Sequence, residues 1–202
     1  MRGGCGGSQE NAAAKSREDL NRYLHYFTRY DNHDRSAKLD QEVYATIERT
    51  MEALQAKTEL SWIEVQFLKQ AADILFQCRM TLKWTYAFAF YLKRNNQTEI
   101  FEDNQRDLEL AVEQLSEMLE RPIDFSALAQ ASAAAATAAG ATPKTVAALR
   151  QEIVDKAQYV DSRRQVLLSD TARGLLEGRW QYIEEQSPAA AAAASSGSSQ
   201  RK

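Results

Sequence analysis

The feature that most constrains the fold of this chain is the near absence of helix breakers from its long middle part. The chain has three prolines and eight glycines, and five of the glycines lie in the first seven residues or in the C-terminal tail. A stretch that lacks both residues can remain helical over many turns, because proline and glycine are the strongest helix breakers. We therefore predict an all-α fold, an elongated bundle of about four to five long helices.

Hydropathy and charge exclude several classes of protein. Alanine supplies much of the 44% hydrophobic content, and no stretch of about twenty apolar residues is free of charge, so no helix is expected to span a membrane. The net charge of −3 argues against a general nucleic-acid or anionic-membrane surface, since both need an excess of clustered Lys and Arg. The N-terminus does not resemble a secretory signal, so we expect a cytoplasmic protein, with the nucleus as the alternative.

The small number of cysteines and histidines limits metal and redox chemistry. Cys5, Cys78, His25 and His33 cannot supply the ligands of a multi-zinc module, and they do not resemble a disulfide framework. We interpret Cys78, which lies between leucines on an apolar helix, as a buried thiol with a raised pKa, and His25 as a half-buried structural histidine. We find no candidate catalytic residue and expect no cofactor or metal in this chain.

Charged clusters also have ordinary structural explanations. An acidic cluster lacks the histidine of the Glu-x-x-His motif of di-iron bundles, so solvated carboxylates near a helix start explain it better than a metal site. Arg163 and Arg164 are flanked by acids, which favours ion pairs on a helix face over a phosphate-binding site. The acidic cluster consists of Glu99, Glu102, Asp103, Asp107 and Glu109.

Apolar spacing predicts two helices in the first part of the chain. Residues 1–10 are expected to form a disordered, Gly-rich lead, and an amphipathic helix follows over residues 11–30. The sequence DNHD at 31–34 is expected to interrupt it, and Ser36 caps a second helix that runs to about Lys57. From its spacing alone, Leu39 is either the first core residue of this second helix or an interface residue.

Two further long helices are predicted before residue 121. Ser61 and Glu64 form a capping box, in which each side chain accepts a hydrogen bond from the other residue's backbone N–H. No proline or glycine occurs from there to about Asn95, where the helix is expected to end, so this helix is expected to be the centre of the fold, with several neighbours covering it. A fourth helix is expected over roughly 101–120.

The C-terminal third combines an alanine-rich insert, a last helix and a tail. The run at 127–141 has high helix propensity but no large side chain, so we expect a frayed helix or a disordered insert. Thr142 and Pro143 are a cap and a first-turn proline, from which a helix is predicted to run to about Glu185. Residues 187–202 are expected to form a disordered, solvated tail.

Five sequence blocks cover most of residues 21–183. In chain order they are RYLHYFTRYDNH, ELSWIEVQFLKQAADILFQCR, TYAFAFYLKRNNQ, FEDNQRDLELAVEQLSEMLER and DKAQYVDSRRQVLL. Each alone is an amphipathic helix, but together they are highly specific and resemble the Ariadne domain of the Ariadne family of RING-between-RING (RBR) ubiquitin ligases. The resemblance assigns residues 11–186 to one helical domain with the insert inside it.

The resemblance implies a C-terminal autoinhibitory domain that covers the reactive cysteine of the ligase's second RING until a cullin-RING ligase carrying a ubiquitin-like modifier relieves it. Leu39, Asp40 and Glu113 match the positions that hold the restraining contact in this family. The family has an aromatic residue and a glutamate where this chain has Leu39 and Asp40, which implies a weaker restraint. The contact would be made with a second RING in the same chain or in another.

The parts of the family that carry out catalysis are missing from this sequence. The RING domains, their zinc ligands and the catalytic cysteine are absent, so we expect the chain to be inactive alone and to be a fragment or a truncated form. Two alternatives remain at this point. One is a free-standing helical adaptor that joins two other proteins, and the other is an enzyme that uses an activated Cys78.

Overall fold

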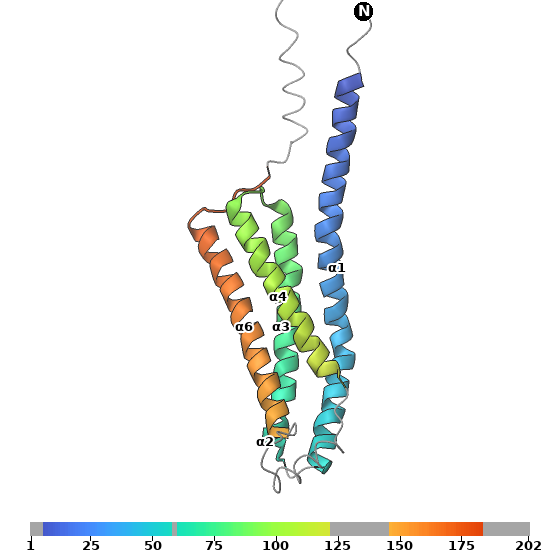
Figure 1. Cartoon of the computed structure of the whole chain (residues 1–202), viewed down its shortest axis with the longest axis vertical. Helices are drawn as coiled ribbons and strands as arrows, with labels where there is room; N and C mark the ends of the chain where they lie inside the picture. The colour runs from blue at the N-terminus through green and yellow to red at the C-terminus, as the bar shows by residue number, and fades with distance from the viewer. Residues whose placement is uncertain (1–5, 58–59, 122–145, 184–202) are drawn as a thin grey trace, which may run out of the picture.

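The computed structural model describes residues 6–57, 60–121 and 146–183 of the chain, and it is all-α over them. The helices are α1 (Gly6–Lys57), α2 (Trp62–Val65), α3 (Phe67–Tyr91), α4 (Asn96–Glu120) and α6 (Val146–Leu176). The one β-type pairing among the described residues is an isolated antiparallel bridge between Leu92 and Tyr182. The predicted elongated helical bundle is therefore confirmed (Figure 1). Within the described residues, none of the helices is both long enough and apolar enough to cross a bilayer.

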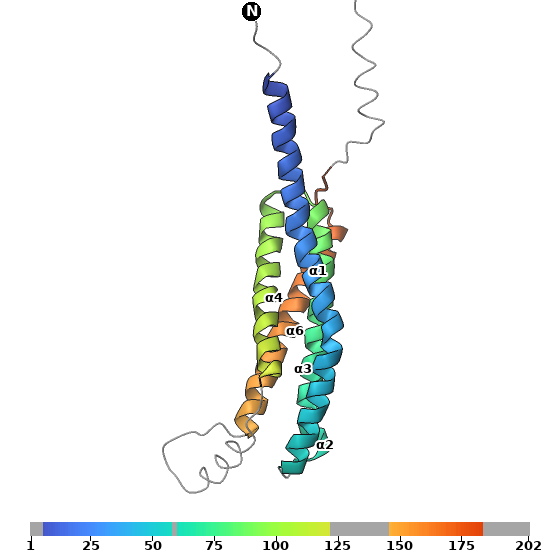
Figure 2. The same cartoon turned by 90° about the vertical axis from the view of Figure 1, so that its right-hand side faces the viewer.

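Helix α3 is the central element of the bundle. Its neighbours α1, α4 and α6 all pack against it, and α6 also packs against α4. Helices α1 and α4 run in one direction while α3 and α6 run in the other, and α1 extends well beyond the bundle at its N-terminal end (Figures 1 and 2). All the side chains described between residues 11 and 21 of that extension are exposed.

The N-terminal part of the chain differs from its prediction, because α1 is a single helix of 52 residues with no break at 31–34. Both aspartates of that segment have partners within the helix or on a neighbouring helix. Asp31 pairs with Arg35 one turn later, and Asp34 receives bonds from Lys38 and from Lys83 of α3, each at 2.6 Å. The helix also begins at Gly6, inside the segment expected to be disordered through residue 10.

The capping box at Ser61 is confirmed. The Glu64 backbone N–H donates to Ser61 Oγ at 3.4 Å, and the Ser61 backbone N–H donates to the Glu64 carboxylate at 2.8 Å. The helix that follows is divided at Gln66 into α2 and α3, and it ends at Tyr91 rather than near Asn95. Asn95 instead caps α4 by accepting the Thr98 N–H at 3.0 Å, so that α4 begins at Asn96 rather than at 101.

The last helix ends nine residues earlier than predicted, at Leu176 rather than Glu185. Gly178 has a φ of 66°, which glycine adopts without strain. Its N–H donates to Leu175 O, and the Arg179 N–H donates to Gly174 O at 2.9 Å, which together form a Schellman motif. The chain then crosses to the C-terminal end of α3, where the backbone N–H groups of Lys93 and Ile183 bond across the bridge between Leu92 and Tyr182.

The core lies along α3 and receives one face of each neighbouring helix. The expectation that several neighbours cover this helix is confirmed by α1, α4 and α6, although two of its large side chains, Trp84 and Tyr91, remain 58% exposed. The predictions for the insert at 127–141, for Thr142 and Pro143, and for the tail at 187–202 lie outside the described residues. The largest fully buried side chains are Phe101, Ile47, Met51, Leu54, Leu68, Leu75, Leu82, Leu92, Leu108, Leu115, Ile153 and Leu167.

Candidate interaction surface

The residues predicted to form an interface lie on α1 and α4. Leu39 is 60% exposed on α1, and Glu113 is exposed on α4. Asp40 follows Leu39 on the same helix, but its side chain lies outside the part of the structure that is described. The alternative that Leu39 is the first core residue of a separate helix is wrong, because α1 is continuous and its buried face passes through Ala37 and Ile47 instead.

Two side-chain links between α1 and α4 bring these residues to similar heights in the bundle. Tyr26 Oη donates a hydrogen bond to Glu102, and Nε2 of His33 lies 3.3 Å from Oε1 of Glu109. Leu39 lies six residues beyond His33, and Glu113 four beyond Glu109. At 1.5 Å per residue they are about 9 and 6 Å beyond the contact between His33 and Glu109, in the direction that both helices share (Figure 1).

His33 forms the more deeply buried of the two links, at 4% exposure. Its ring stacks on Tyr86 of α3, with 5.7 Å between centroids and 9° between planes. Tyr86 Oη donates to Glu109 at 2.8 Å, so the carboxylate is held by groups from both α1 and α3. The bond from His33 lowers the pKa of Glu109, against the opposing effect of burial, and the hydroxyl of Tyr86 lowers it further.

Sequence reasoning missed this cluster because it placed His33 in an expected break between helices. One signal in the sequence could have revealed the cluster, because the spacing of positions on the buried face continues through residues 31–34 without interruption. Tyr26, Tyr30, His33 and Ala37 follow at intervals of four, three and four residues, which is the spacing of one face of a single helix.

The second link, between Tyr26 and Glu102, lies where α1 passes the C-terminal end of α3. Burial, with the hydrogen bond to Glu102, raises the pKa of Tyr26 to about 12. Arg22, one turn earlier, donates to the carbonyl oxygens of Phe90 and Leu92 at 3.0 and 2.8 Å, and so satisfies C-terminal carbonyls of α3. His25 is exposed beside Arg29 rather than half-buried as predicted, and its pKa is lowered by partial desolvation and by that guanidinium.

The reactive groups considered in the sequence have structural environments. Cys78 is fully buried, which raises its pKa to about 12 and confirms the interpretation of a buried thiol.

The charged residues considered in the sequence have partners within the protein. Arg164 pairs with Asp161 at 2.7 Å, and Arg163 pairs with Asp107 of α4, which confirms ion pairing at these positions. Each carboxylate of the acidic cluster has a protein partner: Arg94 for Glu99, Tyr26 for Glu102, Arg106 for Asp103, Arg163 for Asp107 and His33 for Glu109.

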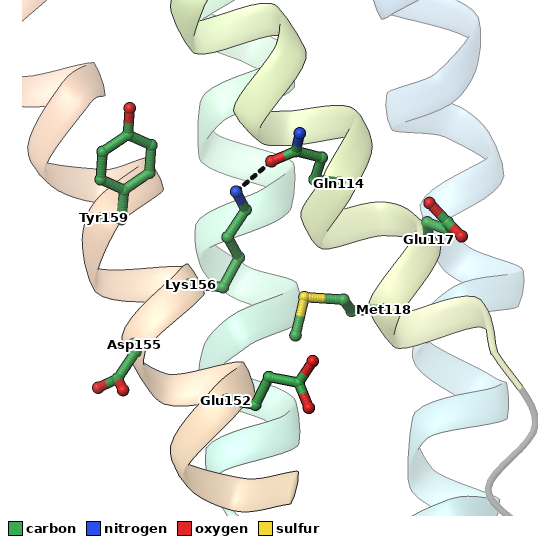
Figure 3. A pocket seen from close by; sticks show the side chains of 7 residues that line it. All are labelled: Gln114, Glu117, Met118, Glu152, Asp155, Lys156 and Tyr159. Carbon is green, nitrogen blue, oxygen red and sulfur yellow. Dashed lines mark hydrogen bonds between the residues drawn. The ribbon is translucent and has the colours of Figure 1, made fainter.

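A shallow hollow lies between α4 and α6, beginning at Gln114, the residue after Glu113. Figure 3 shows Lys156 reaching across it from α6 to donate a hydrogen bond to Gln114. Met118 forms its apolar floor, and its other lining residues are mostly acidic or polar. Among the described residues, no group of three or more His, Cys, Asp or Glu side chains is placed to hold a metal ion.

Comparison with known proteins gives one family match and several close relatives. A family model described as the Ariadne domain matches residues 21–132. Three of the curated relatives are E3 ubiquitin-protein ligases: dbl4 of Schizosaccharomyces pombe (56% identical over 87% of this chain), ariadne-1 of Drosophila melanogaster (46% over 86%) and ARIH1 of Homo sapiens (45% over 87%). The matched segments are 31%, 31% and 28% of those relatives, so this chain spans less than a third of their length.

Proposed function

Since the chain belongs to the Ariadne domain family, we propose that it is the autoinhibitory helical domain of an Ariadne-type RBR ubiquitin ligase. In this proposal it packs on the second RING of such a ligase and covers the cysteine that carries ubiquitin. A cullin-RING ligase that carries a ubiquitin-like modifier then draws the domain away and relieves the restraint. The ligase names of the relatives support the pathway, and the geometry around Leu39 supports the mode of action.

The observation that carries the proposal is the exposure of Leu39. It is 60% exposed, although the leucines of the core face, such as Leu54, are fully buried. An exposed apolar side chain on α1, with an exposed carboxylate at a similar height on α4, fits the pattern of a protein interface with an apolar anchor and a polar rim. Leucine offers less contact area than the aromatic residue usual in the family, so the restraint is weaker here.

The chain contributes contact rather than chemistry in this proposal. Cys78 has no exposed surface, and burial holds its pKa far above the range in which a thiolate forms at neutral pH. Thioester chemistry therefore belongs to the partner's cysteine, together with the zinc of its RING domains. Burial of Cys78 also weighs against the alternative of an enzyme that uses this thiol.

The test is inhibition in trans by the purified chain. The partner is the catalytic part of a full-length relative, zinc-loaded and ending before its own Ariadne domain, and the readout is ubiquitin loading of its cysteine. We expect the chain to show no loading alone and to suppress loading of the partner as its concentration rises. Glu113→Arg should weaken binding by about 2 kcal/mol, roughly 30-fold in Kd, if the carboxylate is a charged contact in the interface.

Asp103→Arg is the matched control for that variant. Asp103 is exposed on the same helix and undergoes the same change of charge, but it lies ten residues from Glu113, which is about 15 Å along the helix. Equal loss of binding in both variants, or no binding of the wild-type chain at tens of micromolar, would refute the proposal. A complex with other proteins that survives changes at Leu39, Asp40 and Glu113 would instead favour a free-standing adaptor.

A further inference from the structure

The two links between α1 and α4 have the same spacing on both helices. Tyr26 and His33 are seven residues apart on α1, and their partners Glu102 and Glu109 are seven residues apart on α4. Because α1 and α4 run in the same direction, both links are satisfied at a single register of one helix against the other (Figures 1 and 2). A shift of either helix along its axis breaks both.

Apolar packing alone sets this register weakly. Helix α1 packs mainly on α3 and touches α4 over much less of its length. Burial of apolar surface is non-directional, whereas a hydrogen bond to a carboxylate is lost when its atoms separate by an ångström or so. The α1–α4 links are therefore the interactions that favour one axial position of α1 against α4.

We infer that Tyr26, His33, Glu102 and Glu109 are positioning residues for the proposed inhibitory surface. They hold Leu39 and Asp40 of α1 at a set height relative to Glu113 of α4, so that one partner surface meets all three. This inference rests on the proposed function and deepens it, because it assigns the geometry of the surface to the side chains that link α1 to α4. His33 acts at this surface through Glu109 and through the ring of Tyr86.

Helix α4 offers a matched control for these links. Asp103 and Asp107 lie between Glu102 and Glu109 on the helix, but Asp103 pairs with Arg106 of the same helix and Asp107 with Arg163 of α6. The double variants Glu102→Ala/Glu109→Ala and Asp103→Ala/Asp107→Ala each remove two carboxylates from α4. Net charge and long-range attraction to a partner therefore change equally, and only the first variant removes the α1–α4 links.

The experiment measures register and binding separately in the full chain. Register is read from the distance distribution between spin labels at Leu39→Cys and Glu113→Cys, in a Cys5→Ser background, where the buried Cys78 does not label. Binding to the zinc-loaded catalytic part of a relative is measured on unlabelled chains. Circular dichroism confirms that each variant is helical, and Glu109→Gln replaces the first double variant should that one unfold.

We expect Glu102→Ala/Glu109→Ala to broaden or shift the distance distribution and to weaken binding at least about tenfold. Asp103→Ala/Asp107→Ala should leave the distribution narrow and change Kd by less than about twofold, as surface substitutions usually do. The same distribution in both variants overturns the inference, as does equal weakening of binding. If the wild-type chain fails to bind, the proposed function fails, while the distance distributions still decide whether the links set the register.

Discussion

A Cβ atom added at Gly174 would lie 2.5 Å from Nε1 of Trp180, so the indole of Trp180 packs against the bare backbone of α6. The same nitrogen donates to Thr171 O at 3.0 Å, and the side chain is 6% exposed between Phe88 and Phe101. The contact joins the chain beyond α6 to α3 and α4. The absence of a side chain at Gly174 is therefore a requirement of the fold.

Gly174→Ala should destabilise the protein although alanine is the better helix former. Helix propensity favours alanine by about 1 kcal/mol, whereas displacing a packed indole costs about 1–3 kcal/mol in overpacking and more in lost contacts. We expect a lower free energy of unfolding in urea. In a Trp180→Ala background the clash is gone, and the same change should be neutral or stabilising. Destabilisation of equal size in both backgrounds would contradict this explanation.

Cys78 should be inert toward alkylation in the native protein. Burial raises its pKa to about 12, which lowers the thiolate fraction at pH 8 by about 1000-fold relative to an ordinary thiol and adds to the block on access. The measurement is the rate of iodoacetamide reaction in a Cys5→Ser variant, with and without denaturant. Reaction of the folded chain at the rate of the denatured one would show that the thiol is accessible.

The Glu109 carboxylate should make stability depend on pH in acid. Its pKa in the folded state is below the ordinary value of 4.5, so its contribution is complete above that value and is lost as pH falls through the lowered pKa. Glu109→Gln should reduce the free energy of unfolding at pH 7 by about 1.5 kcal/mol, the size of a hydrogen bond to a charged group, and the difference from wild type should shrink in acid. Urea titrations of wild type and Glu109→Gln at pH 7 and in acid measure this difference in the free energy of unfolding.

Glu113→Gln is the control for the pH prediction, because its side chain is exposed one turn away on the same helix. We expect it to keep the acid dependence of the wild type. If the difference in free energy of unfolding between wild type and Glu109→Gln stays constant as pH falls, the effect comes from the shape of the side chain rather than from its charge.

Leu39 should contribute little to stability. Because it is 60% exposed, Leu39→Glu is expected to change the free energy of unfolding by no more than about 0.5 kcal/mol. The comparison is Leu54→Ala on the buried face of the same helix, which should cost about 2–5 kcal/mol. Thermal or urea unfolding measures both. A large loss of stability in Leu39→Glu would show that Leu39 is buried in the core, and it would remove the main support for the proposed interface.

Much of the fold was predictable because it depends on local signals. The lack of breakers predicted long helices, the capping box at Ser61 is present, and the helix before Pro122 ends at Glu120 as expected. The Ariadne resemblance stated from the five sequence blocks is confirmed by the family match. The helices and the cap depend on residues that are close together in sequence, and the resemblance depends on the order of the five blocks along the chain.

The errors came where tertiary partners override local preference. Asp31, His33 and Asp34 are polar residues that favoured a break, but Asp34 pairs with Lys83 of α3 and His33 lies against Glu109 of α4 inside a continuous helix. No local pattern announces partners that lie 49 or 76 positions away. At the end of α6 a local signal did exist, since Gly174 and Gly178 lie within the segment predicted as helix.

The candidate site was predictable in part. Spacing left Leu39 either in the core or on the surface, and only the resemblance assigned it to an interface. The exposure of Leu39 now excludes the core, while the links through Tyr26 and His33 depend on how α1 lies against α4, which the sequence does not reveal.

The unbroken course of α1 fixes the direction of its exposed N-terminal part. Because α1 is one continuous helix, the contacts that hold it against α3 and α4 also orient residues 11–21, whose side chains are all exposed. Those eleven residues, about 16 Å of helix, therefore project beyond the bundle along a line set by inner contacts such as those of Tyr26 and His33 (Figure 2).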